Sequence, residues 1–116
     1  MARDEAYVLD MLLAARRAVE GLSDADLQTF SQSWKIQSVV VHQLLILGEA
    51  AKRVSPEFRS RYPHIPWRSV AGQRDVLIHN YDAHDLPTIW NVVKQELPHL
   101  IESLESIIPE CDKEAD

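Results

Sequence analysis

The stretch 39-VVVHQLLIL-47 decides the fold of this 116-residue chain, because seven of its nine residues are apolar. With its flanking residues it predicts one long central helix from about Ser33 to Val54. The β-branched residues slightly disfavour a helix, but the length of the stretch and its lack of turn residues favour a helix over a strand. Apolar residues fall nearly all round the circumference, so we expect this helix in the middle of a bundle or at a subunit interface.

A second helix is predicted before this centre. Apolar residues with helical spacing indicate a helix from about Asp4 to Leu22, with Gly21 as a stop signal near its end. Ser23, followed three residues later by Asp26, is typical of the N-cap of a short further helix. The apolar stripe comprises Val8, Met11, Leu12, Ala15, Ala18, Val19 and Leu22.

After the predicted central helix, serine and proline residues mark where the next helices begin. Ser55 and Pro56 predict the cap and the first position of a short helix. The segment 62-YPHIPW-67 then reads as a rigid connector, because its two prolines fix the backbone. Pro66 can open the next helix, which we expect from Trp67 to His79 or Asn80.

A last long segment closes the predicted fold. Asp85 is expected to cap it, its apolar residues recur with a seven-residue rhythm, and Pro98 should kink or split it. The sequence therefore predicts an all-α, antiparallel helical bundle of about four to five helices. We expect a single domain over residues 1–110 and an acidic, frayed tail over residues 111–116.

Composition limits the class of protein. A hydrophobic fraction of 46% with only 3 glycines argues for a compact helical domain and against disorder. The lone cysteine, Cys111, cannot form an intrachain disulfide. Charged residues interrupt the first thirteen positions, and no apolar run is long enough for a membrane span. We therefore expect a cytoplasmic protein without a leader or a membrane anchor.

Charge is divided along the chain, although the net charge is −6. Residues 52–74 carry six basic residues and one acidic residue, a local charge of +5. Residues 96–116 carry one basic residue and seven acidic residues, a local charge of −6. A basic middle can hold an anionic ligand on an acidic protein. Lys52, Arg53 and Arg68 are accordingly candidates for binding RNA. The alternative is that these cations only solvate helix faces.

The stretch 74-RDVLIHNY-81 carries the residue types that act on a phosphate. Arg74 can hold and neutralise phosphate oxygens through its fork of donors. His79 can move a proton near neutral pH, and Tyr81 can donate a hydrogen bond or accept a modifying group. On a surface helix each of these residues is more often only a solvated side chain, so the motif needs support from its context.

Helical spacing tests whether these residues can cooperate. Asp75 and His79 lie four residues apart on one face, so Asp75 can orient the imidazole or raise its pKa. Arg74 and His79 differ by roughly 140° in projection, so on one straight helix they point to different sides. They can converge if the helix ends or distorts before His79, or if a second copy contributes across a two-fold interface. The motif therefore predicts a homodimer.

The remaining histidines and the tryptophans are expected to be structural. His42 lies in the central apolar helix, where a satisfied core residue or an interface residue is the simplest interpretation. Trp34, Trp67 and Trp90 are expected to anchor the core between helices. The sequence contains no HExxH or comparable pattern, so we predict no metal and no cofactor.

The motif Arg74–x4–His79–x–Tyr81 resembles that of the HEPN-domain proteins, and most closely that of the HepT-like toxins, the DUF86 group. The resemblance runs through nearly the whole chain in order. It includes the segments 47-LGEAAKRVS-55, 62-YPHIPWR-68, 85-DLPTIW-90 and 96-ELPHL-100, and Glu49 within the first of them is a family-like residue without an assigned role.

The resemblance implies a dimeric all-α bundle that acts as a metal-independent endoribonuclease, the toxin of a toxin–antitoxin pair. It implies Arg74 and His79 as catalytic residues and Asp75 and Asn80 as supporting ones. Its implied partner is a nucleotidyltransferase antitoxin of the MntA type, which silences the toxin by AMPylation of Tyr81. Two alternatives remain open: a non-catalytic nucleotide- or RNA-binding module, and a protein-interaction subunit of a nucleotidyltransferase complex.

Overall fold

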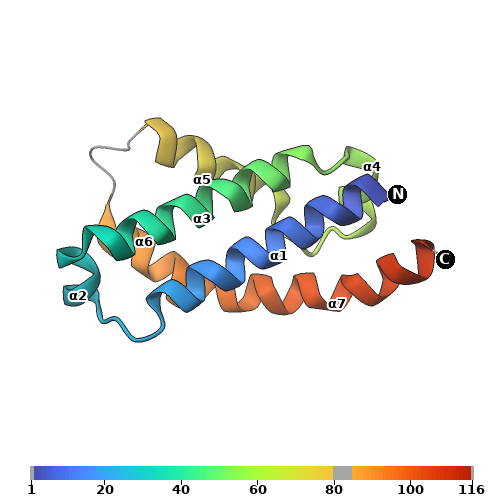
Figure 1. Ribbon diagram of the computed structural model, residues 1–116. Coiled ribbons are helices and arrows are strands. Elements are labelled where there is room, and N and C mark those ends of the chain that lie inside the picture. Colours follow the sequence, from blue (N-terminus) through green and yellow to red (C-terminus); the bar gives the residue numbers. More distant parts are fainter. Residues whose placement is uncertain (1, 80–84, 116) are drawn as a thin grey trace.

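The computed structural model describes residues 2–79 and 85–115, and within these ranges it is helical without a strand (Figure 1). This confirms the predicted all-α fold. Four longer helices build the bundle and three six-residue helices connect them. The elements are α1 (Ala2–Leu22), α2 (Leu27–Gln32), α3 (Trp34–Arg53), α4 (Pro56–Arg61), α5 (Trp67–His79), α6 (Leu86–Asn91), the π-helical segment η2 (Val92–Glu96) and α7 (Leu97–Ala115).

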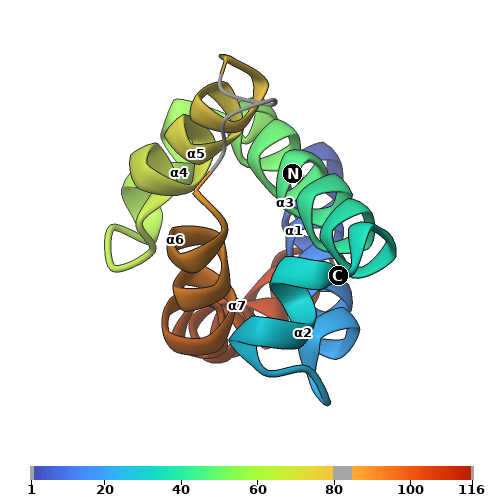
Figure 2. The ribbon, with the colours of Figure 1, turned by 90° about the vertical axis from the view of Figure 1, so that its left-hand side faces the viewer.

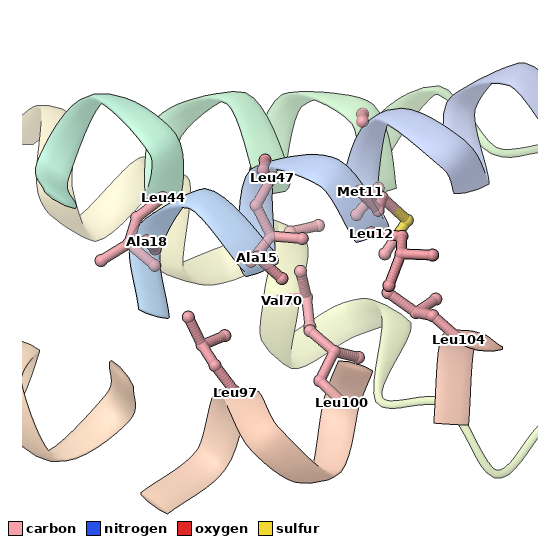
Figure 3. Close-up of a cluster of buried hydrophobic side chains, with 14 of the residues drawn as sticks. Met11, Leu12, Ala15, Ala18, Leu44, Leu47, Val70, Leu97, Leu100 and Leu104 are labelled. Atoms are coloured by element: carbon pink, nitrogen blue, oxygen red, sulfur yellow. The ribbon is translucent and has the colours of Figure 1, made fainter. Parts of the chain in front are cut away.

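The four longer helices lie in the order α5, α3, α1, α7 around the bundle, as the end-on view of Figure 2 shows. Helix α3 packs against both α1 and α5, and α1 packs against α7. Figure 3 shows part of the core between them, with Val70 of α5 and Leu100 of α7 among its buried side chains. None of the helices in the described ranges is long and apolar enough to cross a membrane.

Side-chain caps define the helix starts that the sequence predicted. The Oγ atoms of Ser33 and Ser55 each accept a hydrogen bond of 3.2 Å, from the backbone N–H of Ile36 and of Phe58. Asp85 accepts one of 3.3 Å from the N–H of Thr88. The predicted starts of α3, α4 and α6 are therefore confirmed, because each signal acts within three residues of itself.

Helix α1 ends at Leu22 as predicted, but the predicted Ser23 cap of the next helix is wrong. The short second helix is capped by Asp26, whose Oδ1 accepts a 2.7 Å hydrogen bond from the N–H of Thr29, whereas the Ser23 hydroxyl donates to the carbonyl of Glu20. Gly21 does not stop α1 through a left-handed conformation, since no described glycine has a positive φ. A Cβ at Gly21 would lie 3.1 Å from Cγ1 of Val39, so this glycine lets α1 and α3 approach closely.

The predicted break at Pro98 is confirmed and takes the form of the π-helical segment η2. The N–H of Leu97 donates to the carbonyl of Val92, five residues earlier, instead of to the carbonyl four residues earlier. Proline lacks an N–H, and its ring clashes with the carbonyl four residues before it in a regular helix. One widened turn before Pro98 relieves this clash while the chain continues as α7.

The structure corrects the expected burial of the central helix. Its inner arc is buried, but His42 is exposed, Val39 is 48% exposed and Trp34 is 70% exposed. His42 and Trp34 are thus not core residues in this chain. Trp67 is buried as predicted and donates from Nε1 to the carbonyl of Tyr62 at 3.0 Å, while Trp90 is half-buried.

The N-terminal helix is fastened by one buried carboxylate. Asp4 is only 4% exposed, and its two oxygens accept hydrogen bonds from the N–H and the hydroxyl of Ser55 at 2.8 and 2.9 Å. This contact ties the first turn of α1 to the cap of α4. At the other end of the chain α7 runs on to Ala115, and the predicted domain boundary at residue 110 stays a prediction.

Candidate functional site

Helix α5 carries the first part of the motif in its last two turns. It is held in the bundle by its buried residues, which are Trp67, Val70, Ala71 and Leu77. The side chains of Arg74 and His79 lie outside those that the structure describes, and Asn80 and Tyr81 lie outside the described residues altogether. For Arg74 and His79 the structure therefore gives the position of the backbone only.

That place bears on how Arg74 and His79 could be brought together. Helix α5 continues through His79, so it does not end before that residue, as one of the two alternatives required. On a continuous helix, positions five residues apart differ by about 140° in projection. The backbone of one chain therefore places positions 74 and 79 on different sides of α5, and the contribution of a second copy stays a prediction.

Asp75 is the one residue of the motif whose side-chain partner can be named. Its Oδ1 lies 2.9 Å from Nζ of Lys52, and this ion pair joins α5 to α3. The two side chains are 47% and 42% exposed, so solvent screens the pair and its contribution to stability is small. It marks the level at which α5 lies against α3. The expected contact of Asp75 with His79 stays a prediction.

The basic middle of the sequence is largely engaged within the fold. Arg53 forms an ion pair of 3.2 Å with Glu49, one turn before it on α3. Arg59 donates to the carbonyls of Val54 and Ala51 and so caps the end of α3. Of the three predicted RNA-binding cations, Lys52 and Arg53 are thus ion-paired, and Arg68 is exposed in the first turn of α5. An incoming phosphate would have to compete with Asp75 and Glu49 for the first two.

A groove of about 450 Å³ lies along the face of α3 that carries Glu49. We call it the α1/α3 groove. Its floor is apolar and its rim carries charges of both signs and an imidazole. Its lining residues are Tyr7 and Asp10 from α1 with His42, Leu45, Ile46, Glu49, Ala50 and Arg53 from α3.

Sequence reasoning did not find this groove. Tyr7 and Asp10 stand on the polar side of an ordinary amphipathic helix, and no local pattern connects them with residues some forty positions later. The one related feature of the sequence is that apolar residues surround nearly the whole of α3. This pattern predicted a helix that is covered either by the bundle or by a subunit interface. Among the side chains that the structure describes, no group of three or more His, Cys, Asp or Glu could hold a metal ion.

Comparison with known proteins identifies the relatives of this chain. The Ribonuclease HepT-like family matches residues 11–107. A Methanocaldococcus jannaschii protein named "Putative RNase MJ0125" is 33% identical over 109 residues, which cover 94% of each chain. A Thermococcus cleftensis protein named "Probable ribonuclease HepT" is 35% identical over 94 residues, which cover 81% of this chain and 86% of that one.

A further Methanocaldococcus jannaschii relative, "Putative RNase MJ1380", is 31% identical over 89% of this chain and 94% of its own length. No solved structure gave a significant match. The family match extends from α1 to the last buried turn of α7 and so includes α3, α5 and Arg74 to Tyr81. The chain therefore belongs to the HepT-like family of ribonucleases.

Proposed function

We propose that this protein is a metal-independent endoribonuclease in which Arg74 and His79 are catalytic. The observation that carries the proposal is the position of the motif: a HepT-like chain places Arg74 and His79 in the last two turns of α5. Asp75, which binds Lys52 there, and Asn80 are proposed as supporting residues. Arg68, with Lys52 and Arg53, is proposed to hold the RNA backbone.

The chemistry needs only the groups that these residues supply. The 2′-hydroxyl of the RNA attacks the adjacent phosphorus, the bond to the 5′-oxygen breaks, and the products are a 2′,3′-cyclic phosphate and a 5′-hydroxyl. His79 takes the proton from the 2′-hydroxyl or gives one to the leaving oxygen, a contribution of about 10²–10⁴-fold in rate. Arg74 stabilises the charge that builds on the phosphate oxygens.

A homodimer supplies the second proton-transfer group. Because α5 continues through His79, one chain presents Arg74 and His79 to different sides, and two copies related by a two-fold axis can present both to one cleft. One His79 then acts as base while the other acts as acid. The fold contains no sheet that reads bases among its described residues, so the proposed substrate is single-stranded RNA selected by access to the cleft.

The finer proposal concerns control. We place the protein as the toxin of a toxin–antitoxin pair in the cytoplasm, with an MntA-type nucleotidyltransferase as its antitoxin. The support is the resemblance of the motif, with Tyr81 two residues after His79. Each AMP on Tyr81 adds a bulky anion beside a cationic site and so excludes RNA by occupancy and by charge.

Two variants separate catalysis from mere binding. His79→Ala should remove RNA cleavage and keep RNA binding within a few-fold, whereas Arg74→Ala should weaken both. Cleavage and binding of a labelled single-stranded RNA are measured on the same preparations, with His99→Ala on the exposed face of α7 as the matched control. Binding without cleavage by the wild-type protein would instead favour a non-catalytic RNA-binding module.

A second experiment tests the control. The purified antitoxin with ATP should add AMP to the wild-type chain and abolish its cleavage of RNA, and Tyr81→Phe should receive no AMP and remain active. The site is read by mass spectrometry of the peptide that contains Tyr81. AMP on Tyr7, which is half-buried at the rim of the α1/α3 groove, would contradict the assignment.

A further inference from the structure

One tryptophan lies on the surface of this chain without packing into its core. Trp34 begins helix α3, and 70% of its side chain is exposed, the largest fraction among the exposed large apolar residues that the structure describes. Trp67 is buried and Trp90 is half-buried, so Trp34 is the one of the three that the core leaves in water. An exposed indole presents a large flat face, on which another flat ring can stack.

The neighbours of Trp34 on its side of α3 are polar. One turn later on the helix come Gln37 and Ser38, and the uncharged helix α2 ends two residues before Trp34. A protein contact usually uses a contiguous apolar patch, whereas a single ring among polar residues suits one planar ligand.

The backbone beneath Trp34 is held on both sides. The side chain of Ser33 caps α3. Nε2 of Gln37 donates to the carbonyls of Phe30 and Ser31 at 2.9 and 3.1 Å, which ties α3 to the end of α2. Because the backbone is fixed, stacking immobilises only the two side-chain torsions of Trp34, and the entropic cost of binding stays small.

A cation accompanies the ring. Nζ of Lys35 lies 5.8 Å from the centroid of the Trp34 ring. A tryptophan with both ring faces covered could not keep 70% of its side chain exposed, so the face away from Lys35 is open. A base that stacks on the open face therefore has a cation close by for its phosphate. The whole of α3 is basic, because it carries Lys35, Lys52 and Arg53 against Glu49, a net charge of +2.

Trp34 lies on the flank of α3 that faces α5. It precedes Lys52 by 18 residues, which is five full turns of an α-helix, so the two side chains share one side of α3. Lys52 is the residue of α3 that pairs with Asp75 of α5. Along the helix axis, positions 34 and 52 are about 27 Å apart.

The end of α5 is directed toward the Trp34 end of α3. The two helices pack together and run antiparallel (Figure 1), so the last turn of α5 lies between the levels of Lys52 and Trp34. A strand of RNA with a phosphate at this turn can therefore extend along α3 until one of its bases meets Trp34.

We propose that Trp34 and Lys35 form a nucleobase-binding subsite, in which one base of a single-stranded RNA stacks on the indole and its phosphate binds the ammonium of Lys35. This rests on the proposed ribonuclease and extends its substrate site beyond the motif. Every base has a flat π-face, so the subsite adds affinity for RNA without reading its sequence. It selects unpaired RNA, because the bases of a duplex are stacked on one another.

The affinity for RNA tests the subsite. In a His79→Ala background, chosen to prevent turnover, Trp34→Ala should raise the Kd for a labelled single-stranded RNA by about fivefold or more. Trp34→Tyr keeps an aromatic ring and should stay within about twofold of the parent. Leu27→Ala, at an exposed leucine of α2, is the matched control and should keep the parent's Kd. Fluorescence anisotropy of the labelled RNA measures these constants, and an unchanged Kd in Trp34→Ala would overturn the proposal.

Two further measurements separate stacking from an effect on the fold. A sugar–phosphate strand of the same length without bases should bind the parent and Trp34→Ala equally, because it offers no ring to stack. RNA should quench the tryptophan fluorescence of the parent, and this quenching should be absent in Trp34→Tyr although that variant still binds. An equal loss of affinity for the base-less strand, or quenching that persists in Trp34→Tyr, would show that no base stacks on this ring.

Salt dependence tests the role of Lys35. Lys35→Gln removes one phosphate contact, so the slope of log Kd against log salt concentration should fall by about 0.7. Arg17→Gln, at an exposed cation of α1, is the control and should keep the slope of the parent. Equal slopes in the parent and in Lys35→Gln would contradict the phosphate contact.

Cleavage distinguishes a failure of the subsite from a failure of the function. If both proposals hold, Trp34→Ala with His79 intact raises KM for RNA and keeps kcat. If RNA binds through Trp34 but the wild-type protein cuts none, the subsite stands and the ribonuclease falls. If the wild-type protein cuts RNA and Trp34→Ala keeps its KM, the ribonuclease stands and the subsite falls. Weaker self-association of Trp34→Ala in ultracentrifugation, with unchanged affinity for RNA, would assign the ring to a protein contact and overturn the subsite.

Discussion

At the residue scale, the three tryptophans show how burial decides the role of a side chain. Trp67 is 6% exposed, and its ring packs against Phe58 with a centroid distance of 6.3 Å, whereas Trp34 is 70% exposed beside Lys35. Trp67→Ala should therefore lower the free energy of unfolding by about 3–5 kcal/mol. Trp34→Ala should change it by about 0.5 kcal/mol or less. Urea unfolding measures both, and equal losses would contradict the burial described here.

The buried carboxylate of Asp4 is a second test at this scale. It accepts two hydrogen bonds from Ser55, so Asp4→Ala leaves a backbone N–H and a hydroxyl without their acceptor. We expect a loss of about 1–3 kcal/mol in the free energy of unfolding. Asp10→Ala, at an exposed position of the same helix, is the control and should cost much less. Urea unfolding with no difference between the two variants would contradict the tie between α1 and α4.

The N-cap of α2 gives a prediction for pH. The backbone N–H of Thr29 lowers the pKa of Asp26 below its ordinary value of 3.8. A lowered pKa means that this group's contribution to stability is present above the unfolded pKa and is lost as the pH falls through the folded pKa. The difference in melting temperature between the wild type and Asp26→Ala should therefore shrink when the pH is taken from neutral to below 3.8. A difference that grows on acidification would contradict this cap.

At the element scale, Gly21 and Gly72 differ in what surrounds them. A Cβ at Gly72 on α5 meets nothing within 4 Å, whereas one at Gly21 meets Val39 at 3.1 Å. Gly72→Ala should therefore stabilise the protein by about 0.5–1 kcal/mol through helix propensity alone. Gly21→Ala should gain less, because α1 and α3 have to separate slightly. Thermal unfolding compares them, and a larger gain at Gly21 would contradict the close approach.

Helix starts could be read from the sequence because their causes are local. Ser33, Ser55 and Asp85 each cap a helix within three residues, and Pro98 acts on the carbonyl four residues before it. The exposed arc of α3 could not be read in this way. Its apolar residues occupy nearly the full circumference, so only the positions of α1 and α5 determine which of them are covered.

The same limit applies to the site. The proposed motif over residues 74–81 is contiguous, so its order alone could suggest it. The ion pair of Lys52 with Asp75, the capping role of Arg59 and the lining of the α1/α3 groove depend on contacts between separate helices. Charge counting placed these cations in one basic segment, and only the fold shows which carboxylates and carbonyls engage them.

At the scale of the whole molecule, the bundle is a platform that presents one end of α5 next to an open face of α3. The core holds α5 in place, and the Lys52–Asp75 ion pair joins α5 to α3. The proposed ribonuclease site needs more than this one chain presents, because we propose that a second copy supplies its other proton-transfer group.

The most direct test of the account is the rate at which the purified protein cuts a labelled single-stranded RNA in EDTA, compared with His79→Ala. Mass spectrometry first confirms that Tyr81 is unmodified, and ultracentrifugation confirms that both proteins are dimers. We predict cleavage by the wild type and a loss of about 10²-fold or more in the variant. Equal cleavage by the two proteins, or none by a dimeric and unmodified wild type, would contradict the assignment of His79 and of the ribonuclease site.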